Sequence, residues 1–477
     1  MSEPSAETAS PPDRAGGVGG SVASPLTNLL RSFSPSRVPL MSRGNYRREL
    51  MAAGVLPFLL VVFEGSVMSV LARLLFEGEV APALLNTVTG VIAVVPALAN
   101  LSSFIWVRLS NGRNKVRFIT LLQGVMVLLA LGVAFVPVNT TGLIMIAALC
   151  LLGRTCWAGV STIRSTIWKL NYPDGARATI TGRFAMIQVL LLAALSLGLG
   201  KLMDIDERAF RVLIPVGCVL GLLGRWAWTG VRVRGHSKLI AGEQETGARG
   251  GPSFNPLSMV QVLADDRRYA AYMLCQFLLG LGNIASVTLL AVIIRETFDV
   301  NYRDSLLVTT VLQFGIMPIA IPFWAKFLDG THIVRFRAVH SWFFVAALIV
   351  LLIGVETKAF WLLYGYAILK GIAFGGGVLG WTLGHLDFAT PEKSSQYMGV
   401  HVTLTGVRGL LCGVLGVQVY LLLGGAEGGA TPFIAGCLAL TITGGLGFIW
   451  MTRHFKKHGL FERSGEPEPL QPSQVER

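Results

Sequence analysis

The chain has 477 residues, of which 53% belong to the apolar set AVILMFWYC and only 14% are charged; soluble globular domains carry about 25% charged residues. The net charge of +13 does not indicate nucleic-acid binding, because the basic residues are spread over alternating short loops and do not gather on one polar domain. The composition therefore excludes an ordinary soluble protein and predicts one that crosses a lipid bilayer many times.

The chain begins with a polar segment rich in Ser, Pro, Ala and Gly that lacks the apolar core of a signal peptide. We expect it to be a disordered tail. Apolar runs follow, each near the roughly 20 residues that a membrane span needs. Twelve such runs lie at about 51–75, 82–106, 116–137, 141–168, 181–203, 211–230, 270–294, 305–325, 333–354, 359–386, 399–424 and 430–452.

The longest polar stretch, residues 231–268, divides these runs into two groups of six. Its last part, Pro256 to Ala264, alternates apolar and polar residues and predicts a short amphipathic helix in the membrane interface. The sequence thus predicts an all-α membrane protein of two six-helix bundles. The expected parts are an N-terminal tail (1–45), a first bundle (46–230), a central loop (231–263), a second bundle (264–452) and a C-terminal tail (453–477).

Basic residues mark one side of the membrane. They precede the first span and fill the turns after spans 2 and 8, whereas the intervening turns are neutral or mixed. By the positive-inside rule these segments are cytoplasmic, so both termini are cytoplasmic and the number of spans is even. The residues are Arg31, Arg37, Arg43, Arg47, Arg48, Arg108, Arg113, Lys115, Arg117, Lys326, Arg335 and Arg337.

The two halves repeat each other at an offset of 218 residues. Residues 106–112 (WVRLSNG) align with 324–330 (WAKFLDG), and the triplet Val-Arg-Phe recurs at 116–118 and 334–336. The offset crosses an even number of spans, so the repeats have the same orientation and are related by an axis along the membrane normal. We expect Trp106 and Trp324 to occupy equivalent positions.

This pattern resembles the major facilitator superfamily. The family carries a loop of the form Gly-x-x-x-Asp-(Arg/Lys) after spans 2 and 8, and here the Asp position holds Asn111 and Asp329, with Val107 and Ala325 at the Gly position. The resemblance implies a central cavity lined by spans 1, 4, 7 and 10 and a cytoplasmic gate. The gating residues that it suggests are Arg108, Asn111, Arg113, Lys326 and Asp329, to which we add Arg408 in the glycine-rich eleventh span, where anchoring is the alternative.

Three ionisable residues lie near span centres: Glu64, Arg154 and Lys370. Such groups are costly at bilayer depth and mark functional sites by default. All three belong to the spans that the resemblance places around the cavity. We therefore predict a substrate-binding and coupling site of Glu64, Arg154, Trp157, Gln276, Asn283, Lys370 and Trp381. The alternative is that Glu64 pairs with Arg154 or Lys370 and only holds the halves together.

Other charged residues lie closer to span ends. For Arg164, Lys169 and Arg183 we expect side chains that extend to the lipid headgroups, and for His385 a solvated imidazole. Gly375, Gly376 and Gly377 indicate close helix packing. All six cysteines fall inside predicted spans without metal-ligand spacing. We expect no metal, no cofactor and no enzymatic residues.

The sequence therefore predicts a secondary transporter of the inner or plasma membrane, with a small anionic or zwitterionic organic solute as substrate and protons as the possible coupling ion. A drug or lipid exporter on the same fold is one alternative. A membrane sensor or scaffold that has lost transport is another, since this fold hosts many functions.

Overall fold

The computed structural model describes residues 31–461 except 207, 249–250, 299 and 301, and every regular element in this part of the chain is a helix. The first half contains α2 (Arg43–Val55), α3 (Pro57–Leu60), α4 (Gly65–Phe76), α5 (Pro82–Leu101), α6 (Ser103–Ser110), α7 (Lys115–Ala134), α8 (Thr140–Asn171), α9 (Asp174–Ile205) and α10 (Phe210–Thr229). The second half contains α13 (Arg267–Thr297), α14 (Tyr302–Leu306), α15 (Leu312–Asp329), α16 (Ile333–Glu356), α17 (Trp361–Leu383), α18 (Ser394–Leu410), α19 (Gly416–Leu422) and α20 (Ala430–His458). Between them lie α11 (His236–Ala248) and α12 (Ser258–Asp265).

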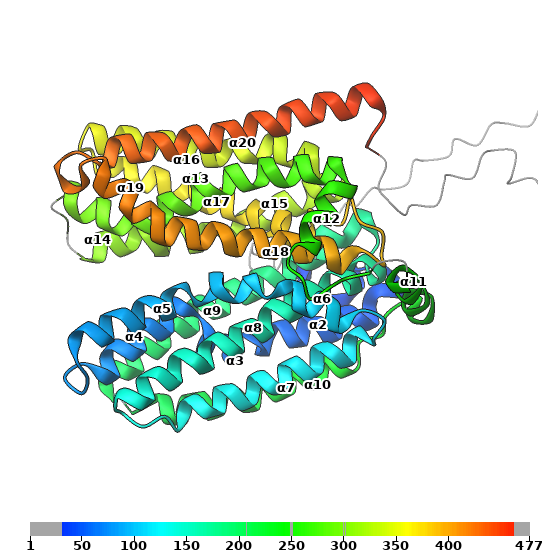
Figure 1. Cartoon of the computed structure of the whole chain (residues 1–477), viewed down its shortest axis with the longest axis horizontal. Helices are drawn as coiled ribbons and strands as arrows, with labels where there is room; N and C mark the ends of the chain where they lie inside the picture. Colours follow the sequence, from blue (N-terminus) through cyan, green and yellow to red (C-terminus); the bar gives the residue numbers. More distant parts are fainter. Residues whose placement is uncertain (1–30, 207, 249–250, 299, 301, 462–477) are drawn as a thin grey trace, which may run out of the picture.

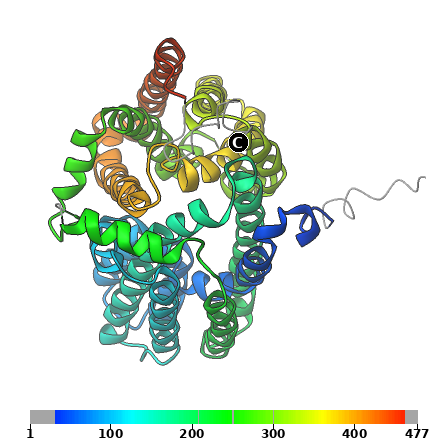
Figure 2. The ribbon, with the colours of Figure 1, turned by 90° about the vertical axis from the view of Figure 1, so that its right-hand side faces the viewer.

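The helices form two bundles that lie side by side (Figure 1). Within the described residues, 11 helices are long and apolar enough to cross a membrane, and 12 if the bent pair Leu40–Phe63 and Gly65–Phe76 is one span. The predicted all-α architecture is thus confirmed. We call the two ends of the molecule the α11 end and the α14 end, which lie right and left in Figure 1; Figure 2 views the molecule from the α11 end.

The repeat is visible in equivalent contacts. Helices α7 and α16 begin at Lys115 and Ile333, which are 218 residues apart. Trp106 packs edge-on against Phe118 with ring centroids 6.3 Å apart, and Trp324 packs edge-on against Phe336 at 5.5 Å. The offset of 218 residues therefore relates two tryptophans, Trp106 and Trp324, that pack edge-on against equivalent phenylalanines.

The first span is a broken helix, where we expected a continuous one. A 3-10 turn, η3 (Val61–Phe63), ends at Glu64, whose backbone is extended (φ −79°, ψ 115°), and α4 continues at an angle of 49°. Pro57 removes a backbone donor shortly before this break. Gly65 lies so close to the backbone of α5 at Ile92 and Ala93 that a side chain there would collide with it. The break thus lets α4 pack directly on α5.

The ordered chain also extends beyond the bundles that we expected. Residues 31–45, assigned to a disordered tail, form η1 (Pro35–Arg37), η2 (Leu40–Ser42) and the start of α2, and Ser42 Oγ donates to Asn171 O at 2.9 Å. The central loop contains α11 and the expected amphipathic helix, α12. At the other end, α20 continues to His458. The expected tails over 1–30 and 462–477 lie outside the described residues.

Candidate functional site

Packing at the break of the first span brings Glu64 to Arg154. Phe63 inserts its ring against Gly153 of α8, where any side chain would collide with it. The neighbouring residues, Glu64 and Arg154, therefore meet. Arg154 Nη1 lies 3.1 Å from Glu64 Oε2. Of the two sequence alternatives for the partner of Glu64, the structure shows Arg154.

This ion pair is neither buried nor fully solvated. The Glu64 side chain keeps 26% of its accessible surface and the Arg154 side chain 20%. Both groups are thus partly accessible from outside the protein, although Glu64 lies at the break of the first span and Arg154 within α8, a candidate span. A fully buried pair would resist separation more strongly, because leaving one charge unpaired there costs several kcal/mol. The Glu64–Arg154 pair can exchange partners.

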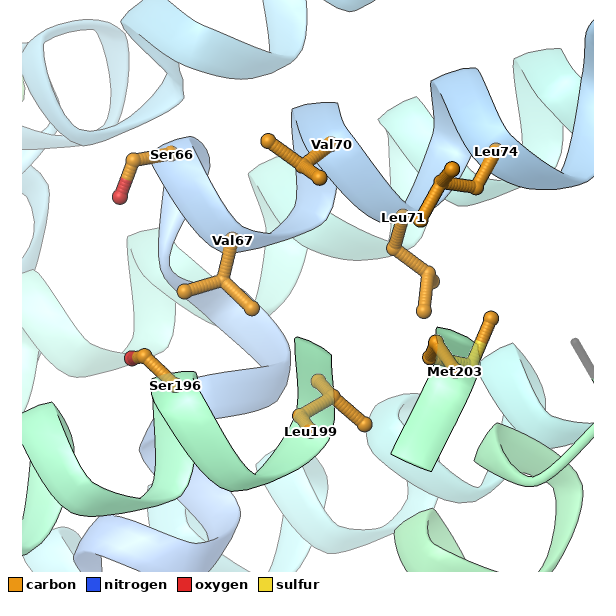
Figure 3. Close-up of a pocket in the computed structure, with 8 residues that line it drawn as sticks. All are labelled: Ser66, Val67, Val70, Leu71, Leu74, Ser196, Leu199 and Met203. Atoms are coloured by element: carbon orange, nitrogen blue, oxygen red, sulfur yellow. The ribbon is translucent and has the colours of Figure 1, made fainter. Parts of the chain in front are cut away.

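An apolar cleft of about 200 Å³ begins two residues beyond Glu64 (Figure 3). It lies between α4 and α9, and its two hydroxyl groups, on Ser66 and Ser196, lie at one end of the view. The remaining lining residues are Val67, Val70, Leu71, Leu74, Leu199 and Met203. The cleft offers hydrophobic surface directly beside the charged pair.

Lys370 does not join Glu64 and Arg154, contrary to our expectation. Its side chain is fully buried in the second half, where Nζ lies 3.4 Å from Ser286 Oγ and 5.6 Å from each ring centroid of Phe344, Tyr366 and Phe374. The sequence shows Lys370 as a charge inside an apolar run but does not tell which side of α17 faces the other half. The interior of the second bundle is therefore where this cation lies.

Three other predicted residues are joined by hydrogen bonds in the second half. Trp381 Nε1 donates to Thr405 Oγ1 at 3.1 Å, and Arg408 Nη2 donates to the same oxygen at 2.9 Å. Arg408 Nη1 donates to Gln276 O at 2.6 Å. Arg408, expected at a gate or as an anchor, thus belongs to the same group as two predicted binding residues.

The last two predicted binding residues are half-buried. Asn283 Oδ1 has no hydrogen-bond partner among the described residues. Trp157 lies beside Arg164, whose guanidinium carbon is 5.5 Å from the indole centroid. Ser161 and Ser165, which follow Trp157 at intervals of four residues along α8, are buried.

Hydrogen bonds join the two halves at the α11 end. The Asp329 carboxylate accepts from Ala178 N at 2.7 Å and Thr179 N at 2.9 Å, on α9 of the other half. Ser103 Oγ donates to Gly399 O, and Thr166 shares a hydrogen bond with Ser395. Asp329, predicted as a gating residue, therefore ties the halves together.

The corresponding loop of the first half has a different partner. Asn111 Nδ2 donates to Glu243 O of α11 at 3.4 Å, and the Glu243 carboxylate accepts from Gly112 N and Lys115 Nζ, both at 2.7 Å. Arg113 and Lys326, predicted to act at the gate, are exposed. Arg108 is also exposed, and its guanidinium carbon lies 5.9 Å from the Phe254 ring centroid.

Several charged or titratable groups that we expected at the lipid headgroups, in solvent or in loops are buried. Arg164 does not extend to headgroups, because it stacks on Trp168 at 4.2 Å within the first half. Lys169 donates to Leu386 O across the halves, and His385 is fully buried rather than solvated. Arg337 and Lys115, counted as loop charges, are buried as well. Nothing in the sequence singled out four further buried residues, which are Glu49, Glu243, His340 and His401.

No group of three or more His, Cys, Asp or Glu residues suited to a metal ion occurs in the part of the chain that the structure describes. The six cysteines are free and buried.

Comparison with known proteins identifies the architecture. No protein-family model matches the chain, and a search of curated proteins finds no similar sequence. Among solved structures, the chain is similar to the major facilitator superfamily proton:xylose symporter XylE, with 13% identity, a TM-score of 0.62, and coverage of 88% of this chain and 99% of that one. It is also similar to a bacterial homologue of the iron transporter ferroportin in its outward-facing state, with 13% identity, a TM-score of 0.61, and coverage of 85% and 99%. At this identity the likeness shows the fold: the chain has the major facilitator fold, as the sequence resemblance predicted.

Proposed function

We propose that the chain is a secondary active transporter that moves a small anionic or zwitterionic organic solute by alternating access. The observation that carries this proposal is the partly exposed Glu64–Arg154 pair at the break of the first span. An ion pair within the membrane is costly to maintain and marks a functional site by default. The fold, with two bundles joined by hydrogen bonds at one end, supports the same function.

The pair suggests how proton and solute are coupled. While the site is empty, Arg154 is the charge partner of Glu64. An anionic solute competes for Arg154, and a proton can then replace Arg154 as the partner of Glu64. Anion and proton therefore move together as symport. A cationic solute would compete with the proton for Glu64, which gives antiport.

Proteoliposomes with and without a pH gradient test this mechanism. A panel of radiolabelled organic anions first identifies a solute that wild-type protein accumulates. Glu64→Gln should abolish the proton-driven part of accumulation, whereas Glu77→Gln, an exposed carboxylate beyond α4, should leave it unchanged. Proton-driven accumulation that survives Glu64→Gln undiminished would show that the pair is structural.

We also propose that the α11 end faces the cytoplasm of a cell whose inner or plasma membrane holds the protein. The basic residues at that end support this orientation. Topology reporters fused at Gly465 and Gly425 should report opposite sides of the membrane. Reporters on the same side would contradict the arrangement.

The apolar cleft in Figure 3 favours a second candidate, the export of an amphiphile. An amphiphile would place its charged part near Glu64 and its hydrocarbon part in the cleft. Extrusion of fluorescent cationic dyes from the same proteoliposomes, combined with no accumulation of any anion, would favour this candidate. Anion uptake without dye extrusion would exclude it.

A further inference from the structure

Five buried polar side chains gather in the second half, apart from the Glu64–Arg154 pair. They are Tyr272, Arg337, His385, His401 and Arg408, each no more than 2% exposed, and we call them the polar core. His401 is close enough to Arg408, Arg337 and His385 to sense their charge. Arg408 is close enough to Arg337 for the two guanidinium groups to repel each other.

Helix α17 is shaped to receive this cluster. Gly376 and Gly380 of α17 and Gly384, which follows its last residue with helical backbone angles, lie one turn apart on one face. A side chain at Gly376 would collide with His340, one at Gly380 with the Arg337 guanidinium, and one at Gly384 with the Tyr272 hydroxyl. The glycine row therefore admits a row of polar side chains into the interior of the bundle.

Arg337 has no negatively charged partner among the described residues. Its Nη1 lies 3.2 Å from His340 Nδ1, and His340 Nε2 lies 2.7 Å from Ala373 O. A carbonyl oxygen only accepts, so Nε2 carries the hydrogen and Nδ1 accepts from Arg337. His340 is thus a neutral imidazole that leaves the charge of Arg337 unbalanced.

Arg408 is in the same situation. Its two hydrogen bonds go to the neutral oxygens of Gln276 and Thr405. The Nε atoms of Arg337 and Arg408 both lack a partner in the described part of the chain. Asp387 is an acidic residue near this cluster, close enough to Tyr272 for its charge to act there. Its Oδ2 accepts from Ile333 N at 2.6 Å and lies 3.9 Å from His332 Nδ1, and it forms no ion pair with Arg337 or Arg408 among those found in the described part of the chain.

Further polar atoms of the cluster are also unpartnered among the described residues: the Tyr272 hydroxyl, Gln276 Oε1 and both ring nitrogens of His385 and His401. Buried polar atoms without partners indicate a bound water or ion. Water would satisfy the hydrogen bonds, but it would not balance two neighbouring guanidinium charges, which are costly to bury unless they are paired.

We propose that the polar core is a binding site for a small oxoanion, a carboxylate or phosphate group, held by Arg337 and Arg408. Guanidinium groups bind both anions through paired charge-assisted hydrogen bonds. Tyr272 and His401 supply further donors. The site does not depend on the transport mechanism proposed above, since none of its residues contacts Glu64 or Arg154. The anion is either the acidic group of an organic solute or free phosphate.

Thermal unfolding of the purified full chain in detergent tests the site. Sodium acetate and sodium phosphate are titrated against sodium chloride at equal ionic strength, because a ligand that binds only the folded state raises the unfolding midpoint with saturation. We expect a saturable rise for acetate or phosphate in the wild type. Arg337→Gln and Arg408→Gln should weaken the apparent affinity at least tenfold, whereas Arg453→Gln, exposed on α20, should leave it unchanged.

Tyr272→Phe provides a variant with nearly unchanged volume, and it should weaken binding several-fold even if the arginine variants do not fold. Saturation by acetate at lower concentration than phosphate indicates a carboxylate ligand, and the reverse order indicates phosphate. A wild-type midpoint that follows ionic strength alone, or a rise of equal size in every variant, would overturn the site. Saturable binding by a protein that transports nothing would overturn only the proposed function.

Discussion

At the scale of single residues, Glu49 shows that a charged group near a span end can be part of the interior. It is 3% exposed, and its carboxylate accepts from Trp168 Nε1 and from the Tyr172 hydroxyl, both at 2.6 Å. Arg164, stacked on Trp168, stabilises the carboxylate electrostatically. These contacts connect α2 to the end of α8 within the first bundle.

We predict that Glu49→Ala destabilises the folded protein by about 3 kcal/mol, the order expected when buried hydrogen-bond donors lose their common acceptor. The substitution leaves Trp168 Nε1 and the Tyr172 hydroxyl without that acceptor. Glu49→Gln keeps one acceptor oxygen and should cost less. Unfolding of purified protein in detergent measures both, with the exposed Glu79→Ala as control. A loss below about 1 kcal/mol in Glu49→Ala would contradict this role.

The sequence reveals charged residues inside apolar runs, but it does not tell in which direction their side chains point. Glu64 and Arg154 could be predicted because a charge inside an apolar run has few explanations. Lys370 was equally visible, but hydrophobicity on all sides of α17 hides which face meets the other bundle. Arg337 and Lys115 were misassigned because span boundaries are uncertain by a few residues, which is enough to turn a buried cation into an apparent loop charge.

At the scale of elements, α11 is held to the first bundle by a buried ion pair. Glu243 is 2% exposed and accepts from Lys115, which also donates to Ser110 O at 2.6 Å. Burial raises the pKa of the Glu243 carboxyl above its ordinary value of 4.5, and Lys115 and Gly112 N lower it in part. Docking of α11 therefore depends on pH.

The sign of this dependence follows from the proton balance. Docked Glu243 binds a proton more readily than undocked Glu243, because its pKa is raised. The contribution of the Glu243 carboxyl to docking is therefore fully present below pH 4.5 and is lost as the pH rises from there through its docked pKa. Burial also disfavours the charged form of Lys115, its partner in the ion pair, and that group contributes with the opposite sign. Hydrogen exchange over α11, corrected for intrinsic rates, should show lower protection at pH 7.5 than at pH 5. Lys115→Met should steepen the change, and Arg117→Met, an exposed neighbour, should not. Equal protection at both pH values would contradict the prediction.

Most of the spans could be predicted from the sequence, because their length and apolar composition identify them. The start of α16 follows from that of α7 through the repeat. The break at Glu64 could not be predicted, because the packing that accompanies it, Gly65 against the backbone of α5, joins residues far apart in the sequence. Apolar periodicity continues on both sides of the break and gives no sign of it.

At the scale of the whole molecule, one buried apolar cluster is shared by the two bundles. One apolar cluster contains residues of both halves, among them Trp168, Phe184 and Trp324. Two further clusters, one around Phe63 and Ile146 and one around Leu348 and Ile434, each belong to one half. The described contacts thus close the molecule at the α11 end, and the partly exposed Glu64–Arg154 pair is consistent with access from the other end.

The Asp329 carboxylate contributes to the closure at the α11 end. The Asp329 carboxylate accepts two backbone hydrogen bonds from α9, and hydrogen bonds to a charged group contribute about 1.5–3 kcal/mol each. Asp329→Ala should therefore shift the protein toward a state open at the α11 end.

Ser395, 4% exposed in the seam between the halves, becomes a reporter as Ser395→Cys, and the six native cysteines are buried. In inside-out vesicles, a membrane-impermeant maleimide should label Cys at position 395 at least tenfold faster in the Asp329→Ala background. Asp265→Ala, an exposed carboxylate at the same end, should leave the rate unchanged, because Asp265 makes no contact with the other half. An unchanged rate in Asp329→Ala would mean that apolar packing between α15 and α9 holds the seam without this carboxylate.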